Sequence, residues 1–215
     1  MKKVLFLVIM FSLTIITNCK NDENELEQVF ISTDTTELNC QGECQEYLCN
    51  GSNNTMFIPF DVVRKWKISS TGILASSYLD IYVGTEVIDS QNYYRINKTI
   101  NSEIIESTYY RINIDGEIFI RKSNDSNDYL FVSEIKNIGY EWEMPDTNTS
   151  YKIVSKDASI DTSICSYTEL IKIEVYKSGN LNSTRYFKKG LGLVFESFES
   201  FESWNKYLKN IELQY

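Results

Sequence analysis

Apolar residues recur at every second position through most of the chain from Met56 onward. In Leu170–Tyr176, the β-branched residues Ile171, Ile173 and Val175 share one face, whereas the residues between them are mostly polar. Alternation of this period is typical of a half-buried strand, and β-branched side chains favour that conformation. The segment therefore predicts a strand with one face in a core.

Turn signals separate several of these alternating runs. Tyr109–Ile114 and Glu117–Lys122 are joined by Asp115-Gly116, a pair that favours a tight hairpin in which both turn residues adopt positive φ. Ser178-Gly179-Asn180 marks a second hairpin before a strand over Arg185–Lys188. The remaining predicted strands are Val63–Ile68, Tyr78–Val83, Tyr93–Asn97, Tyr129–Ser133, Tyr151–Val154, Leu193–Phe198 and Leu208–Leu213.

Short strands in close succession, with no convincing long helix, predict an all-β fold. We expect a single antiparallel meander over residues 56–215, curved into an open barrel or half-barrel. Glu196–Trp204 fits two patterns, because its aromatic residues are spaced three apart. That spacing suits one side of a short helix, but a strand followed by a loop is the prediction.

The first 19 residues have the pattern of a lipoprotein leader. Two lysines precede an apolar run, Val4–Ile16, which is shorter than the roughly 20 residues needed to span a bilayer. The chain turns polar at Cys19, and no small-residue cleavage site precedes it. We therefore predict a signal peptide over residues 1–18 and a lipid on Cys19. An ordinary secretory signal is the alternative, and Asn18 departs from the usual small residue.

Residues 19–38 are acidic and polar, and residues 39–55 form a cysteine-containing segment before the β domain. A segment with so little apolar surface cannot bury a core, so residues 19–38 are predicted to be a tether. The expected location is a bacterial outer membrane, with the membrane as a partner through the Cys19 lipid. The domain would face either the periplasm or the cell surface.

Charge and composition narrow the functional classes. The full chain has a formal net charge of −9 and no histidine. An acidic protein repels nucleic acid, so nucleic acid is not an expected partner. The lack of histidine disfavours serine or cysteine nucleophile chemistry, and no cofactor or enzymatic activity is predicted. A glycosidase using two carboxylates remains a third hypothesis; its candidate acids are Glu103, Glu106, Asp115, Glu134, Glu141 and Glu143.

Four cysteines lie after the predicted leader and Cys19, an even number that predicts two disulfides in an exported protein. Sequence leaves three pairings open, but one bond should join the segment that holds three of them to the distant strand region, and the other should close a local loop. A four-thiolate zinc site is the alternative, although tight C-x2-C spacing is missing. No metal site is predicted. The four residues are Cys40, Cys44, Cys49 and Cys165.

Several short motifs resemble those of a family of secreted β-proteins and lipoproteins of Bacteroidota, which carry no assigned activity. The motifs are Phe57-Ile58-Pro59-Phe60 followed by Trp66, Tyr109-Tyr110-Arg111 with Asp115-Gly116, Gly139-Tyr140-Glu141-Trp142, and Tyr186–Val194. The resemblance implies an open, curved antiparallel sheet. Structural roles are expected for the most specific residues: Gly190 and Gly192 would allow a bend or close backbone approach, and Trp66 and Trp142 would fill the concave face.

Two functional hypotheses lead. In the first, a lipid-anchored, non-enzymatic envelope protein binds a partner protein or ligand with its concave face or exposed edge. In the second, the curved sheet carries an apolar small molecule or acyl chain. A carrier should contain an apolar cavity of several hundred Å³, whereas a partner-binding module should have a filled core and an exposed aromatic patch.

Overall fold

The computed structural model describes residues 42–52, 56–72, 75–123, 125–144, 147–199 and 204–214. The chain divides into two units, Met1–Thr33 and Asp34–Tyr215, and all the described residues belong to the second. The predicted leader, Cys19 and the tether therefore lie outside the described residues, as does Cys40. No helix in the described part is long and apolar enough to cross a membrane.

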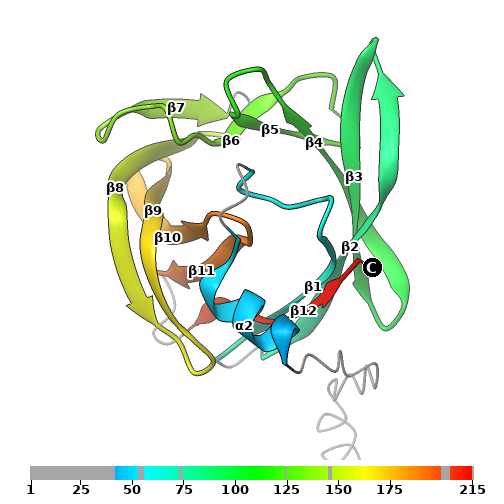
Figure 1. Ribbon diagram of the computed structural model, residues 1–215. Coiled ribbons are helices and arrows are strands. Elements are labelled where there is room, and N and C mark those ends of the chain that lie inside the picture. Colours follow the sequence, from blue (N-terminus) through cyan, green and yellow to red (C-terminus); the bar gives the residue numbers. More distant parts are fainter. Residues whose placement is uncertain are drawn as a thin grey trace, which may run out of the picture. The chain divides into compact units, whose positions relative to one another are not determined.

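Twelve antiparallel strands form one sheet, in the order β6-β5-β4-β3-β2-β1-β12-β11-β10-β9-β8-β7 (Figure 1). Neighbours in the chain are mostly neighbours in the sheet, so the predicted curved meander is confirmed. The strands are β1 Val63–Ser70, β2 Ser77–Ile88, β3 Gln91–Ile100, β4 Glu103–Ile112, β5 Ile118–Lys122, β6 Tyr129–Val132, β7 Glu141–Met144, β8 Thr149–Asp161, β9 Ser166–Lys177, β10 Asn180–Lys188, β11 Gly192–Phe198 and β12 Asn205–Leu213.

The sheet curls until it is nearly a closed barrel. The first and last strands pair with each other, with Trp66 opposite Ile211. The opening lies instead between β6 and β7, which are the two edges of the sheet. There the Trp142 indole N–H donates to the Leu130 carbonyl at 2.8 Å, which links the two edge strands without a backbone ladder. Trp142 thus holds the barrel together where the hydrogen-bonded sheet stops.

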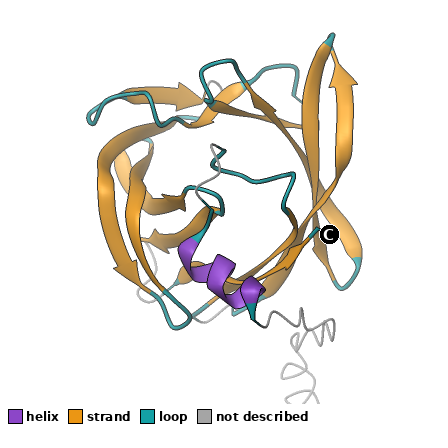
Figure 2. Cartoon of the chain, viewed as in Figure 1, coloured by secondary structure: helices purple, strands orange, loops and turns teal. Residues whose placement is uncertain are grey.

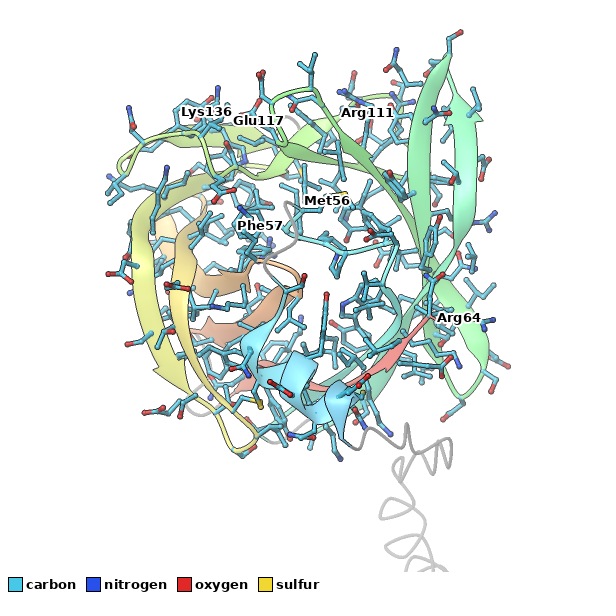
Figure 3. All side chains as sticks on the ribbon, viewed as in Figure 1. Met56, Phe57, Arg64, Arg111, Glu117 and Lys136 are labelled. Carbon is cyan, nitrogen blue, oxygen red and sulfur yellow. A yellow bond between two sulfur atoms is a disulfide. The ribbon has the colours of Figure 1, made fainter. Side chains whose placement is uncertain are left out.

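The helix α2 (Glu43–Asn50) and the described residues after it occupy one end of the barrel interior (Figure 2). The sequence analysis did not predict this helix. Leu48 and Phe60 are each 1 % exposed, and Phe57 is 4 % exposed. Figure 3 places Met56 and Phe57 inside the ring of strands. We call residues 43–52 and 56–60 the plug, because their apolar side chains fill this end of the barrel.

Hydrogen bonds and a disulfide fix the plug to the wall. The Tyr167 hydroxyl donates to the Leu48 carbonyl at 3.2 Å, and the Tyr47 hydroxyl donates to the Gly190 carbonyl at 3.0 Å. Cys49 and Cys165 form a disulfide across a sequence separation of 116 residues. This is the predicted long-range staple. Cys44 is disulfide-bonded as well, but the predicted local loop involves Cys40 and lies beyond the described range.

Gly190 is confirmed at a close backbone approach. Its φ is +78°, and a Cβ there would lie 2.5 Å from the Ser52 backbone nitrogen. Its own N–H donates to the Met56 carbonyl at 3.0 Å. At Gly192, with φ of +85°, a Cβ would lie 3.3 Å from the Ile58 side chain, so the approach there is to a side chain and not to backbone. The neighbour in both cases is the plug and not another strand, and a side chain at Gly190 would push the plug away.

The predicted hairpins form, with one correction. Ser178 and Gly179 both have positive φ, at 51° and 80°, as a tight two-residue turn requires. In the loop around Asp115, however, only Gly116 has a positive φ. The turn is wider because the Asn113 side chain accepts hydrogen bonds from the Asp115 and Glu117 N–H groups. β4 therefore ends at Ile112, and Ile114 is fully exposed rather than facing the core.

The segment Glu196–Trp204 begins as the predicted strand. β11 continues to Phe198, and the Phe198 ring stacks on Trp204 with centroids 4.3 Å apart. Residues 200–203 lie outside the described part of the chain.

Candidate functional site: the barrel lumen

The half of the barrel interior beyond the plug holds an open cavity of about 470 Å³, which we call the lumen. Its wall mixes aromatic, aliphatic, hydroxyl and charged side chains from β2 to β12. Such a volume is within the range of small-molecule sites. The residues that the argument below uses are Tyr78, Asp80, Lys98, Glu106, Thr108, Tyr110, Tyr151, Arg185, Leu193, Glu196 and Lys206.

The inner end of the lumen narrows to a pocket of about 80 Å³. Its lining is largely apolar and includes Ile58 of the plug and Trp66, whose indole N–H donates to the Leu191 carbonyl at 3.1 Å. Phe60 lies behind it and stacks on Tyr94 with centroids 4.4 Å apart. The plug therefore forms the floor of the lumen.

Asp80 is the one acid that lines both the inner pocket and the lumen. Burial raises the pKa of this carboxyl to about 6; Lys98 and Lys206 oppose the rise, and Glu106 adds to it. Among the described residues, none donates a hydrogen bond to its oxygens. Asp80 is thus ionised at neutral pH and leaves its hydrogen-bonding capacity to whatever enters the lumen.

Glu196 also lies on the lumen wall but, unlike Asp80, it is hydrogen-bonded and ion-paired. Its Oε1 accepts hydrogen bonds from Arg185 Nε at 2.7 Å and from the Ser183 hydroxyl at 3.0 Å, and its Oε2 lies 3.6 Å from Lys206 Nζ. Burial alone would raise the pKa of Glu196, but Arg185 and Lys206 hold it below its ordinary value. Glu196 is therefore a fixed anion that orients two cations.

Two tyrosines complete the surroundings of Asp80. Burial is the largest cause that raises the pKa of Tyr78 and of Tyr110 well above the ordinary value, and Asp80 adds to both shifts. Both side chains line the inner pocket and the lumen. No hydrogen bond of either hydroxyl is found within the described ranges. They are neutral groups that can donate and accept.

The residues singled out from sequence surround the plug more than the lumen. Trp66, Gly190 and Gly192 contact the plug or lie beside it, as described above, and Trp142 stacks on Tyr151 with centroids 5.3 Å apart. Of the six candidate acids, only Glu106 lines the lumen. The other five are exposed and face solvent: Glu103, Asp115, Glu134, Glu141 and Glu143.

Sequence reasoning missed Asp80, Arg185, Glu196 and Lys206. The sequence did contain a signal for them. Each is a charged residue within a strand, at a position where the alternation of apolar and polar residues places the side chain in the interior. Such interruptions are ambiguous in sequence, because a strand can also turn its polar face inward toward water.

The arrangement does not offer the pair of free carboxylates that a glycosidase needs. That chemistry requires an acid and a second carboxylate on opposite sides of the bond to be cleaved. In the lumen, Glu196 is engaged by Arg185 and Ser183, and Glu106 by Lys98 at 3.1 Å. No second free carboxylate therefore accompanies Asp80 in the lining of the lumen. No cluster of three metal-ligating side chains occurs in the part of the chain that the structure describes.

No family model, no curated protein and no solved structure matches the chain. The motif resemblance therefore stays a prediction, and the functional argument depends on the lumen itself.

Proposed function

We propose that this protein is a lipid-anchored, non-enzymatic binding protein of the bacterial outer membrane that holds a small polar ligand in the barrel lumen. The observation that carries the proposal is the lumen itself, which combines ligand-sized volume with an ionised carboxylate, Asp80, to which no described residue donates a hydrogen bond. Asp80 is half-buried, and a charge removed from water without a hydrogen-bond donor lowers stability. Its presence is explained if a ligand supplies the partner.

The lining argues against an acyl chain as the ligand. Leu130, Phe131, Val175 and Leu193 supply apolar surface, but charged side chains lie among them. An alkyl chain would displace water from these charges and return no hydrogen bond. An apolar ligand is therefore the second candidate, and the volume of the cavity is the only observation that supports it.

Native mass spectrometry of the full chain, purified after export in mild detergent, tests the proposal. We expect a discrete extra mass that disappears on denaturation. Thr108→Trp should remove that mass, because Thr108 lines the lumen and an indole there would occupy it. Thr168→Trp is the matched control, since Thr168 is an exposed strand residue. Retention of the mass by Thr108→Trp, or its absence from both the parent protein and a metabolite-extract incubation, would contradict the proposal.

The lipid anchor is tested separately. Metabolic labelling with a fatty acid should mark the protein, and Cys19→Ser should abolish the label. Persistence of the label in Cys19→Ser would remove the anchor from the proposal without affecting the lumen.

A further inference from the structure

Two rows of alternating charge cross the lumen wall. In the first, Glu106 of β4, Lys98 of β3 and Asp80 of β2 lie directly opposite one another in the sheet register. Lys98 Nζ contacts Glu106 Oε2 at 3.1 Å, whereas Asp80 makes no ion pair within contact distance in the described structure. We call this row the acidic ladder, because it has two carboxylates and one ammonium.

The second row has the reverse pattern. Arg185 of β10, Glu196 of β11 and Lys206 of β12 are also direct cross-strand neighbours. Glu196 is held tightly by Arg185 at 2.7 Å, but Lys206 lies at the longer distance of 3.6 Å. We call this row the basic ladder, because it has two cations and one carboxylate.

Strand β1 separates the two ladders in the sheet. Its residues Trp66 and Ile68 line the inner pocket and carry no charge. Each ladder ends toward β1, at Asp80 on one side and at Lys206 on the other. Lys206 Nζ also lies over the Phe198 and Trp204 rings, 4.8 and 5.7 Å from their centroids. Lys206 Nζ donates no hydrogen bond within the described ranges. The lumen thus presents a carboxylate and an ammonium on two different parts of one wall.

We propose that the lumen binds a small zwitterion of the amino-acid or short-peptide class, with the ligand ammonium at Asp80 and the ligand carboxylate at Lys206 and Arg185. The inference rests on the proposed function and names its ligand class. Charge-assisted hydrogen bonds at both ends would complete the two ladders. Tyr78 and Tyr110, beside Asp80, offer hydroxyl groups that can accept a hydrogen bond from an ammonium group.

Ligands with a single charge fit this wall less well. A simple anion attracted to Lys206 would meet the carboxylate of Asp80, and a simple cation at Asp80 would meet Lys98 and the basic ladder. Like charges at close range inside a protein disfavour binding more strongly than they do in water. Only a ligand with both signs engages both ladders.

Isothermal titration of the full protein, purified under denaturing conditions and refolded to remove bound ligand, tests the class. The probes are the free L-amino acids and a set of glycine-containing dipeptides. We expect at least one to bind with Kd below about 1 mM. N-acetylation and C-terminal amidation of that probe should each weaken binding at least about tenfold, since each removes one charge. If no probe binds, or if both derivatives bind as well as the parent, the inference is wrong.

Two variants then assign the ends of the ligand. Asp80→Asn should weaken binding of the parent zwitterion and abolish the penalty of N-acetylation, while the penalty of amidation persists. Lys206→Gln should weaken binding of the parent zwitterion and reduce the penalty of amidation, since only Arg185 would remain to meet the carboxylate, while the penalty of N-acetylation persists. This exchange is a double-mutant cycle between protein and ligand, and a purely structural role for either residue would affect all probes equally. The controls are Asp115→Asn and Lys209→Gln, both exposed outside the lumen.

Failure of this inference differs from failure of the proposed function. If native mass spectrometry detects a lumen ligand that lacks an ammonium or a carboxylate, the ligand class is wrong and the binding function stands. If the lumen binds nothing in either experiment, both are wrong.

Discussion

The two ends of the barrel interior are built from the same strands but filled in different ways. At the plugged end, Phe60, Leu48 and Leu191 are each 1 % exposed and pack against other apolar groups. At the open end, the inward positions carry Asp80, Lys206 and other polar groups around a cavity of about 470 Å³. Stability is thus concentrated where the plug completes a close-packed core, and the open end tolerates groups that a core would exclude.

The plugged end serves as the scaffold, and the open end holds the candidate site. Strands β1, β2, β11 and β12 extend through both ends, so the packed end holds their other halves in register. The close packing at this end can compensate for the unfavourable burial of Asp80 at the other. Four predictions test the contrast, in order of expected magnitude.

Removal of the Phe60 ring should have the largest effect on stability. Phe60→Ala should lower the free energy of unfolding by about 3 to 5 kcal/mol, because the ring is buried against Trp66, Tyr94 and Tyr110 and would leave a cavity. Urea unfolding monitored by tryptophan fluorescence measures it. Leu193→Ala, at a half-buried lumen position, is the control and should cost less than about 2 kcal/mol. Equal losses would abolish the distinction between the two ends.

Loss of the Cys49–Cys165 disulfide should have the second-largest effect on stability. Replacement of Cys49 and Cys165 together by serine should lower the free energy of unfolding by about 2 to 4 kcal/mol, because the bond closes a long loop in the unfolded chain. The same denaturant experiment measures it, with the parent protein in reductant for comparison. We expect ligand binding at the open end to persist in the folded variant. Loss of binding at full folding would show that the two ends are coupled.

Glu196 should be stabilising. Glu196→Gln should lower the free energy of unfolding at pH 7 by about 2 to 3 kcal/mol, because Arg185 and Lys206 would lose their shared anion. Since the pKa of Glu196 is depressed in the folded state, its contribution is present above its ordinary value of 4.5 and is lost as the pH falls through the lower folded value. A difference between variant and parent that grows on acidification would contradict this.

Substitution of Asp80 should raise the free energy of unfolding, in contrast to the three changes above, and by the smallest amount. Asp80→Asn should raise the free energy of unfolding at pH 7.5 by about 2 kcal/mol, because the ionised carboxylate is buried without a hydrogen-bond donor. Its pKa is raised from 3.8 to about 6 on folding, so the stability present below pH 3.8 is lost as the pH rises through 6. The difference in free energy of unfolding between Asp80→Asn and the parent protein should therefore vanish near pH 4. Unfolding curves over this pH range measure it, and destabilisation at pH 7.5 would be contrary to the prediction.

Prediction of the fold from sequence succeeded where local signals were strong. Ile171, Ile173 and Val175 do face the core, and Ser178-Gly179 does form the hairpin, because alternation and turn chemistry depend on neighbouring residues only. Prediction was weaker around Asp115, where the Asn113 side chain widens the turn. A side chain that competes for backbone hydrogen bonds is difficult to recognise in sequence.

The candidate site was not predictable in the same way. Glu196 and Arg185 are 11 residues apart in the chain, and Asp80 and Lys206 are more than 100 apart. The β10–β11 hairpin pairs Arg185 with Glu196, whereas Asp80 and Lys206 share one wall only because β1 pairs with β12 and joins the two ends of the meander. Glycine at position 190 was recognised as a close approach, but the neighbour it approaches, Ser52, was not.

The sequence by itself determined the class of fold and the long-range staple to Cys165, because these follow from periodicity and cysteine count. The envelope location stays a prediction from the short leader. Only the tertiary structure decided where the sheet closes, that the segment before β1 turns inward as a plug, and which charges share a lumen. The physical reason is that alternation assigns each side chain to a face of its strand. What fills the space on that face depends on residues distant in the chain, which the closed sheet brings together.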